Sequence, residues 1–218
     1  LVEWPVPLAG RFEERFLALP RELLVSVLQD HQRYFPLEGP DGRLLPMFIT
    51  VANIPSSDPA VVRAGNERVV RPRLSDAAFF WSSDRQQRLD SRSEGLRRVT
   101  FQTQRGSVHD KSERVRKLAQ SVASSIGGDP RLADRAAELA KCDLISAMVG
   151  EFPELQGLMG RYYAQHDGEH AEVCEAIREQ YLPRFAGDEL PATRTGMAVA
   201  IADKLDTIAG IYATGQKP

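Results

Sequence analysis

The hydrophobic pattern changes along the 218-residue chain. Up to about residue 55, runs rich in β-branched and aromatic residues predict short strands at 23–28 (LLVSVL), 33–37 (RYFPL) and 47–53 (MFITVAN). The turn sequence EGPDG lies between the last two runs and predicts a β-hairpin across Gly39 to Gly42. The first part of the chain is therefore expected to contain a small sheet.

The pattern becomes helical from Asp58. An aspartate can cap a helix and proline is tolerated at the first helical position, so Asp58 and Pro59 predict a helix start. A proline in a helix interior removes a hydrogen bond and clashes with the preceding turn. The segment up to about Arg105 is therefore predicted to form helical pieces that are broken at Pro72.

After Gly106 the apolar residues recur at helical spacing. Asp110 and Glu113 resemble a capping box, and Gly127-Gly128 would end the helix that they begin. Helices are predicted from Asp110 to about 126, after Pro130 to about 150, at 170–180 and at about 193–212. The expected fold class is α+β, predominantly α, with a small α+β segment (residues 1–105) followed by an all-helical bundle (residues 106–218).

Two carboxylates lie within predicted apolar or small-residue stripes. Asp143 follows Leu132, Ala136 and Leu139 at helical spacing, and Asp203 lies at the centre of a stripe of small residues between Gly196 and Gly210. Removing an ionised carboxylate from water without giving it a partner costs on the order of several kcal/mol, because the charge loses its hydration. Each aspartate therefore needs hydrogen bonds, a cation or a proton.

Composition and cysteine content narrow the class of protein. The chain is 42% hydrophobic and 27% charged, which is typical of globular proteins, and no apolar run is long enough to cross a membrane. Two cysteines, Cys142 and Cys174, are too few for a disulfide framework and favour a reducing, cytoplasmic location. The first residue is leucine and the chain stops just after a predicted helix, so we expect a fragment of a longer protein.

Charge is distributed unevenly. Residues 63–105 contain ten arginines and five carboxylates, which is a net charge of +5, whereas the net charge of the whole chain is -2. Arginines contact phosphates and aromatic rings stack on unpaired bases, so this basic segment and the aromatic run 79–81 (FFW) suit RNA. The aromatic run could equally belong to the core, and Arg85 and Arg88 could form a solvated helix face. The candidate phosphate contacts are Arg63, Arg68, Arg71, Arg73, Arg97 and Arg98.

The sequence HDGEH at 166–170 is a possible metal motif. Gly168 breaks helicity, so His166 and His170 are not expected to share a helix face, and a loop followed by a helix start is favoured. We therefore predict no catalytic residue in this chain.

The helices that carry AELAKCDL and AVAIADKLD resemble those of the HD superfamily of metal-dependent phosphohydrolases. The resemblance implies metal ligands at a first-helix histidine, an adjacent His-Asp pair and a distant aspartate, where this chain has Lys111, Cys142-Asp143 and Asp203. A lysine would repel a metal cation, so a degenerate site is expected, in which Lys111 pairs with Asp143 or Asp203. The alternatives are an HD-type phosphohydrolase with altered ligands and a shared packing pattern without function.

Longer blocks, among them GNERVVRPRLSDAAFFWSSDR and KCDLISAMVGEFPELQGLMGRYYA, resemble the β subunit of the bacterial tetrameric glycyl-tRNA synthetase. The resemblance implies an α subunit that uses ATP and Mg²⁺ to activate glycine, and a β subunit that recognises tRNA(Gly). The partners would be tRNA(Gly), the α subunit and the remaining domains of the β subunit. The segment itself is expected to need no cofactor and to be inactive alone; a docking platform between subunits is the structural alternative.

Overall fold

The structure, a computed structural model, describes residues 2–215 and contains two compact units. The first unit ends at Ser83 and the second begins at Asp84. The sequence pattern predicts a domain boundary near residue 105. By their packing, residues between Asp84 and Arg105 belong with the helices that follow, because the 3-10 helix η3 (Asp90–Arg98) packs on α3 (Val108–Ser125) and on the short 3-10 helix η4 (Cys142–Ile145).

The first unit contains a three-stranded antiparallel sheet with the order β1-β3-β2. Its elements up to residue 52 are β1 (Val6–Arg11), the 3-10 helix η1 (Glu14–Ala18), α1 (Arg21–Val25), a π-helical turn (Ser26–Asp30), β2 (Phe35–Glu38) and β3 (Leu44–Ala52). The predicted hairpin is confirmed, since β2 pairs with β3 across the EGPDG turn. Phe48 of β3 is buried, stacks on Tyr34 at 4.8 Å between ring centroids, and lies directly over Gly10, where a Cβ atom would collide with the ring.

The strand predicted at residues 23–28 is wrong, because this segment is helical. Leu23, Leu24, Val27 and Leu28 are all buried, with exposed fractions of 1% or less. A strand would place Leu23 and Leu24 on opposite faces, whereas the spacing of these four leucine and valine residues brings them to one side of a helix. Burial of these four side chains on one side of a helix therefore outweighs the strand preference of the valines in residues 23–28.

Helix α2 (Pro59–Asp84) begins as predicted. The Asp58 carboxylate accepts hydrogen bonds from the amides of Ala60 and Val61. The predicted break at Pro72 is wrong, because the helix continues through it. An interior proline usually costs about 3 kcal/mol, and here Pro72 is exposed while Val70 and Leu74 on the other side are fully buried. Burial of that face offsets the missing backbone hydrogen bond.

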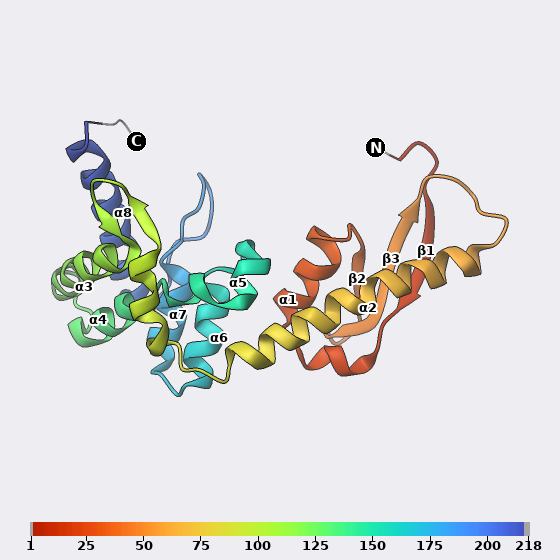
Figure 1. Cartoon of the computed structure of the whole chain (residues 1–218), viewed down its shortest axis with the longest axis horizontal. Coiled ribbons are helices and arrows are strands. Elements are labelled where there is room, and N and C mark those ends of the chain that lie inside the picture. Colours follow the sequence, from red (N-terminus) through yellow and green to blue (C-terminus); the bar gives the residue numbers. More distant parts are fainter. Residues whose placement is uncertain (1, 216–218) are drawn as a thin grey trace. The chain divides into compact units, whose positions relative to one another are not determined.

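The second unit is a bundle of helices with a small hairpin at its start (Figure 1). The hairpin joins β4 (Thr100–Gln102) to β5 (Gly106–Ser107). The α-helices after it are α3, α4 (Pro130–Leu139), α5 (Ala147–Glu151), α6 (Leu158–His166), α7 (Ala171–Glu179) and α8 (Arg194–Ala213), and one further 3-10 helix is η5 (Pro153–Leu155). Helix α3 packs on α4 and α8, and α7 packs on α6 and α8. The α+β, predominantly helical fold class is confirmed.

Two helix boundaries differ from the prediction. The capping box of α3 is formed by Ser107 and Asp110 rather than by Asp110 and Glu113, so the helix begins at Val108. The helix predicted from Pro130 to about 150 ends at Leu139 and is followed by η4 and α5, which leaves Asp143 in a 3-10 turn. Among the described residues, no helix combines the length and the apolar character needed to cross a membrane.

Candidate functional site

Lys111 and Asp203 form an ion pair between α3 and α8. The Lys111 ammonium lies 3.1 Å from Asp203 Oδ1, and the two side chains are only 6% and 18% exposed. The same ammonium donates hydrogen bonds to the backbone carbonyl of Asp203 at 3.1 Å and to Thr207 Oγ1 at 2.5 Å. Lys111 was expected to pair with Asp143 or Asp203, and in the structure it pairs with Asp203.

A second lysine approaches the same carboxylate. Lys141 Nζ lies 3.6 Å from Asp203 Oδ1 and 4.1 Å from the centre of the Tyr181 ring. Burial lowers the pKa of Lys141, although the Asp203 carboxylate opposes this. Burial also disfavours the ionised form of Asp203, but the ammonium groups of Lys141 and Lys111 outweigh it and hold the pKa of Asp203 below its ordinary value. Asp203 is thus an ionised carboxylate with two cationic neighbours.

Asp143 is fully buried but does not face Lys111. Its Oδ2 accepts hydrogen bonds from the backbone amides of Gly157 at 2.6 Å and Gly160 at 3.0 Å, at the N-terminal turn of α6. Burial raises the pKa of Asp143 to about 6, against the effect of these two hydrogen bonds. Its neighbour Cys142 has its pKa raised to about 12 by burial, so its thiol is protonated at neutral pH and is not an activated nucleophile.

Helix α8 also contains a buried aspartate, one turn after Asp203. Asp206 is 5% exposed and accepts hydrogen bonds from Arg114 Nε at 2.7 Å and Nη2 at 3.0 Å. This bidentate pair raises the pKa of Arg114 and joins α3 to α8 one turn beyond the Lys111–Asp203 pair. Arg105 lies 3.8 Å from the same carboxylate. We call Lys111, Lys141, Arg114, Asp203 and Asp206 the buried ion cluster.

The metal implied by the HD resemblance does not fit these residues. The Asp203 carboxylate already contacts an ammonium, Asp143 points at backbone amides, and the Cys142 thiol lies against the carbonyl of Glu138 at 3.4 Å. Within residues 2–215, no group of three or more His, Cys, Asp or Glu side chains is arranged to hold a metal ion. The cluster joins α3 to α8, and its carboxylates are paired with lysine and arginine side chains.

The HDGEH sequence forms a turn, as the sequence analysis favoured. Gly168 has a positive φ of 82° and separates α6 from α7. His166 Nδ1 lies 3.0 Å from Arg85 Nη2, whereas His170 caps α7 by accepting from the Glu172 amide. The two histidines therefore belong to different helix ends and do not converge on one site.

The arginines of α2 are exposed. Arg71 lies 3.2 Å from Glu13, with side chains 68% and 42% exposed, and Arg73 is also exposed. For Arg63 and Arg68, both exposed, no carboxylate of the described residues lies within ion-pair distance. Arg68 and Arg71 are three residues apart and so share one side of the helix. Phe79, which could have been a core residue, is 66% exposed.

Other arginines of the basic segment are engaged within the second unit. Arg92 is buried 3.5 Å from Asp84, and Arg88 contacts Asp90 and Glu169 rather than forming a solvated helix face. Of the candidate phosphate contacts in this unit, Arg97 pairs with Glu94 at 2.7 Å on the surface and Arg98 is exposed. The net charge of +5 therefore overstates the positive charge that is available to a ligand.

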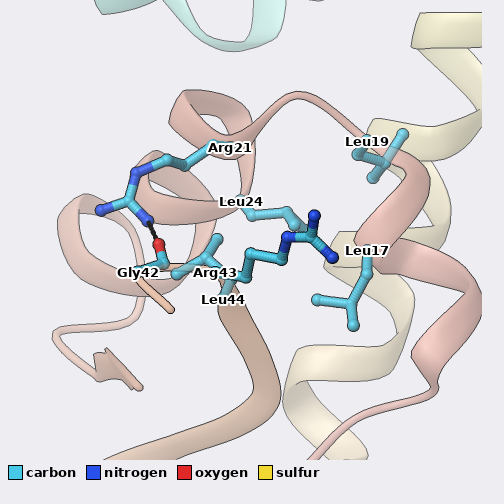
Figure 2. Close-up of a pocket in the computed structure, with 7 residues that line it drawn as sticks. All are labelled: Leu17, Leu19, Arg21, Leu24, Gly42, Arg43 and Leu44. Carbon is cyan, nitrogen blue, oxygen red and sulfur yellow. Dashed lines mark hydrogen bonds between the residues drawn. The ribbon is translucent and has the colours of Figure 1, made fainter. Parts of the chain in front are cut away.

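A cavity of about 350 Å³ lies between α1, the segment after η1 and the β2–β3 turn of the first unit (Figure 2). Leucines form its apolar lining, together with Arg21, Gly42 and Arg43, and the Arg43 side chain extends toward Leu17. Arg21 donates to the Gly42 carbonyl at 3.5 Å and pairs with Glu38, while Arg43 lies 3.7 Å from Asp41. The residues that line the cavity are leucines, arginines and a glycine.

The whole chain, residues 1–218, matches the family model described as "Glycyl-tRNA synthetase beta subunit". The chain belongs to this family. Curated relatives named "Glycine--tRNA ligase beta subunit" include those of Pseudomonas syringae pv. syringae (60% identical), Marinobacter nauticus (56%) and Chromohalobacter salexigens (56%). Each match covers 100% of this chain and 32% of the relative, so the chain spans about a third of their length. The resemblance found in the sequence is confirmed, and the chain is a segment of an aminoacyl-tRNA synthetase component.

Sequence reasoning missed Lys141 and Asp206 of the buried ion cluster. Lys141 immediately precedes the Cys142-Asp143 pair. The direction of its side chain depends on the end of α4 at Leu139, and the apolar periodicity predicted a helix that continued to about residue 150. Asp206 lies three residues after Asp203, one helical turn away, and Arg114 lies three residues after Lys111. That parallel spacing on two packed helices was the available signal for a second pair.

Proposed function

We propose that this segment of the β subunit supports the recognition and positioning of tRNA(Gly) for glycylation by the α subunit. In this proposal the exposed arginines contact phosphates, chiefly Arg63, Arg68, Arg71 and Arg73 of α2, together with Arg97 and Arg98. ATP and Mg²⁺ are used by the α subunit in the cytoplasm, and the segment itself has no cofactor and is not catalytic alone. The remaining domains of the β subunit are its other partners.

The observation that carries the proposal is the exposure of Arg63 and Arg68 without a carboxylate partner among the described residues. A guanidinium in water loses little when it binds a phosphate, whereas one held by a carboxylate must first give up that pair. At about 100° per residue the α2 arginines surround much of the exposed side of the helix, which suits contacts to a phosphate backbone rather than to one small anion.

The HD-type phosphohydrolase with altered ligands has less support. It needs a metal close to Asp203, where the ammonium groups of Lys111 and Lys141 lie 3.1 and 3.6 Å from the carboxylate oxygen. Phosphate ester hydrolysis also needs an activated water or another nucleophile, and the buried thiol of Cys142 is protonated.

The test uses the complete enzyme, with both subunits, in which the β subunit carries Arg63→Ala and Arg68→Ala. We expect the KM for tRNA to rise and the slope of log affinity against log salt to become shallower by about one for each phosphate that the protein no longer neutralises. The KM values for glycine and ATP should not change, because the α subunit binds both. Filter binding across a salt series and aminoacylation kinetics measure these effects.

Arg131→Ala is the matched control, since its side chain is 91% exposed and lies outside the basic segment. It should leave tRNA binding and its salt dependence unchanged. If the double α2 variant behaves like this control, the arginines of α2 do not contact tRNA and the proposal fails.

A further inference from the structure

Helix α8 is apolar on two opposite sides. Its inner side packs on α3, α4 and α7 through fully buried residues that include Ala198, Val199 and Ala202. Its outer side carries large apolar residues at spacings of four, four, three and four, which form one stripe. We call this stripe the α8 apolar face: Met197 (37% exposed), Ile201 (41%), Leu205 (50%), Ile208 (46%) and Tyr212 (59%).

The α8 apolar face contains no charged residue at an exposed position. After Arg194, the remaining exposed positions of the helix are Ala209 and Ala213. A helix on the surface of a globular protein normally has charged residues on its outer side, whereas the charged residues of α8 after Arg194 lie at buried or half-buried positions. Contiguous exposed apolar surface of this kind marks an interaction site.

The loop between α7 and α8 extends this surface into a groove. A groove of about 250 Å³ is lined by Leu182, Pro183, Leu190, Pro191, Met197, Ala200, Ile201 and Lys204. The Lys204 ammonium points away from it and donates to the carbonyls of Gln180 at 3.3 Å and Leu182 at 2.7 Å, so the lysine contributes its aliphatic stem. Phe185 (67% exposed) and Leu190 (72%) belong to the same loop.

The size of this surface favours a partner in the same polypeptide. A helix of 20 residues is about 30 Å long and 10 Å wide, so one helix face offers roughly 300 Å², well below the ~800 Å² per partner of a stable protein–protein interface. A segment tethered in the same chain is present at an effective concentration near the millimolar range, at which a small contact suffices. The curated relatives are about three times as long as this chain, since it covers 32% of them.

We propose that the α8 apolar face and its groove dock an amphipathic helix from a part of the same β subunit that lies outside residues 1–218. The apolar side of that helix packs along Met197, Ile201, Leu205 and Ile208, and a large side chain enters the groove beside Pro183. This inference rests on family membership and on α8, and it does not depend on the arginines of α2.

The test compares this 218-residue chain with a β subunit of the relatives' full length that carries it. A Leu205→Cys variant is treated with a maleimide, since the native Cys142 and Cys174 are both buried. We expect rapid labelling in the 218-residue chain and no labelling in the full-length subunit. Ser124→Cys, at an exposed position of α3, checks that the reagent reaches the surface of both proteins.

A photo-crosslinking residue at position 205 then identifies what covers the face. Cross-links to a segment outside residues 1–218 of the same polypeptide support the proposal. Cross-links to a second β subunit, to the α subunit or to residues 1–83 overturn it, and so does labelling of Leu205→Cys in the full-length subunit.

Leu205→Glu should lower the melting temperature of the full-length subunit and leave that of the 218-residue chain unchanged; an equal shift in both would also overturn it.

Discussion

The two units use their positive charges in opposite ways. In the first unit, Arg63, Arg68 and Arg71 of α2 are exposed, and Arg71 pairs with the half-exposed Glu13. In the second unit, Lys111 and Arg114 are held between α3 and α8 by Asp203 and Asp206. The arginines Arg63, Arg68 and Arg71 of α2 are therefore solvated, whereas Lys111 and Arg114 hold two helices of the second unit together.

The difference follows from the surrounding solvent and not from residue type. An exposed ion pair contributes roughly 0–1 kcal/mol because water already solvates both charges. A buried charge without its partner costs several kcal/mol, since it cannot return to water. Net charge along a sequence is consequently a poor guide to binding until the tertiary partners of each cation are known.

The largest expected effect comes from removing the buried cation. Lys111→Met removes the nearer of the two ammonium groups beside Asp203, and it should lower the free energy of unfolding of the second unit by about 3–5 kcal/mol. Arg68→Met in α2 should change stability by no more than about 0.5 kcal/mol. Urea unfolding followed by circular dichroism measures both. Equal effects of the two substitutions would show that the buried cluster does not stabilise the bundle.

A smaller effect concerns Asp143. Its pKa of about 6 in the fold, raised by burial, exceeds the ordinary value of 3.8. The folded state then binds more protons than the unfolded state between about pH 4 and pH 6, so stability falls as pH rises through that window, by about 3 kcal/mol for two pKa units. Asp143→Asn keeps an acceptor for Gly157 and Gly160 and should remove this fall.

Asp134→Asn is the matched control for that pH dependence. The hydrogen bond from Arg116 lowers the pKa of Asp134, so its carboxylate contributes stability that disappears as pH falls through the lowered pKa, opposite in sign to Asp143. Thermal melts of the native protein and both variants between about pH 3.5 and about pH 7.5 give the slopes. A native profile identical to that of Asp143→Asn would mean that folding does not shift the pKa of Asp143.

The smallest expected effects compare one glycine in each unit. A Cβ atom at Gly196 of α8 would collide with the Glu179 carboxylate, which is fixed by hydrogen bonds from Ala192 and Thr193, so Gly196→Ala should destabilise by about 1–3 kcal/mol. A Cβ atom at Gly65 of α2 would meet nothing within 4 Å, so Gly65→Ala should stabilise by about 0.5–1 kcal/mol. Urea midpoints distinguish the two; destabilisation by Gly65→Ala would indicate that the outer side of α2 is covered.

Features that depend on a few neighbouring residues could be predicted from the sequence. The helix starts at Pro59 and Pro130, the hairpin between β2 and β3 and the helices α7 and α8 could be predicted, because capping groups, turn residues and apolar spacing act within one or two turns. Long blocks of sequence also identified the family, which the comparisons confirm.

Tertiary structure decided what the same local signals left open. Residues 23–28 are helical because four buried side chains need one face, and α2 continues through Pro72 because its inner side is packed. The sequence singled out Asp143 and Asp203 as carboxylates in need of partners. It could not show that backbone amides at the start of α6 bind Oδ2 of Asp143, or that Lys111 and Lys141 lie beside Asp203. The partner of a buried charge depends on which helices pack together, and that information is distributed over the whole unit.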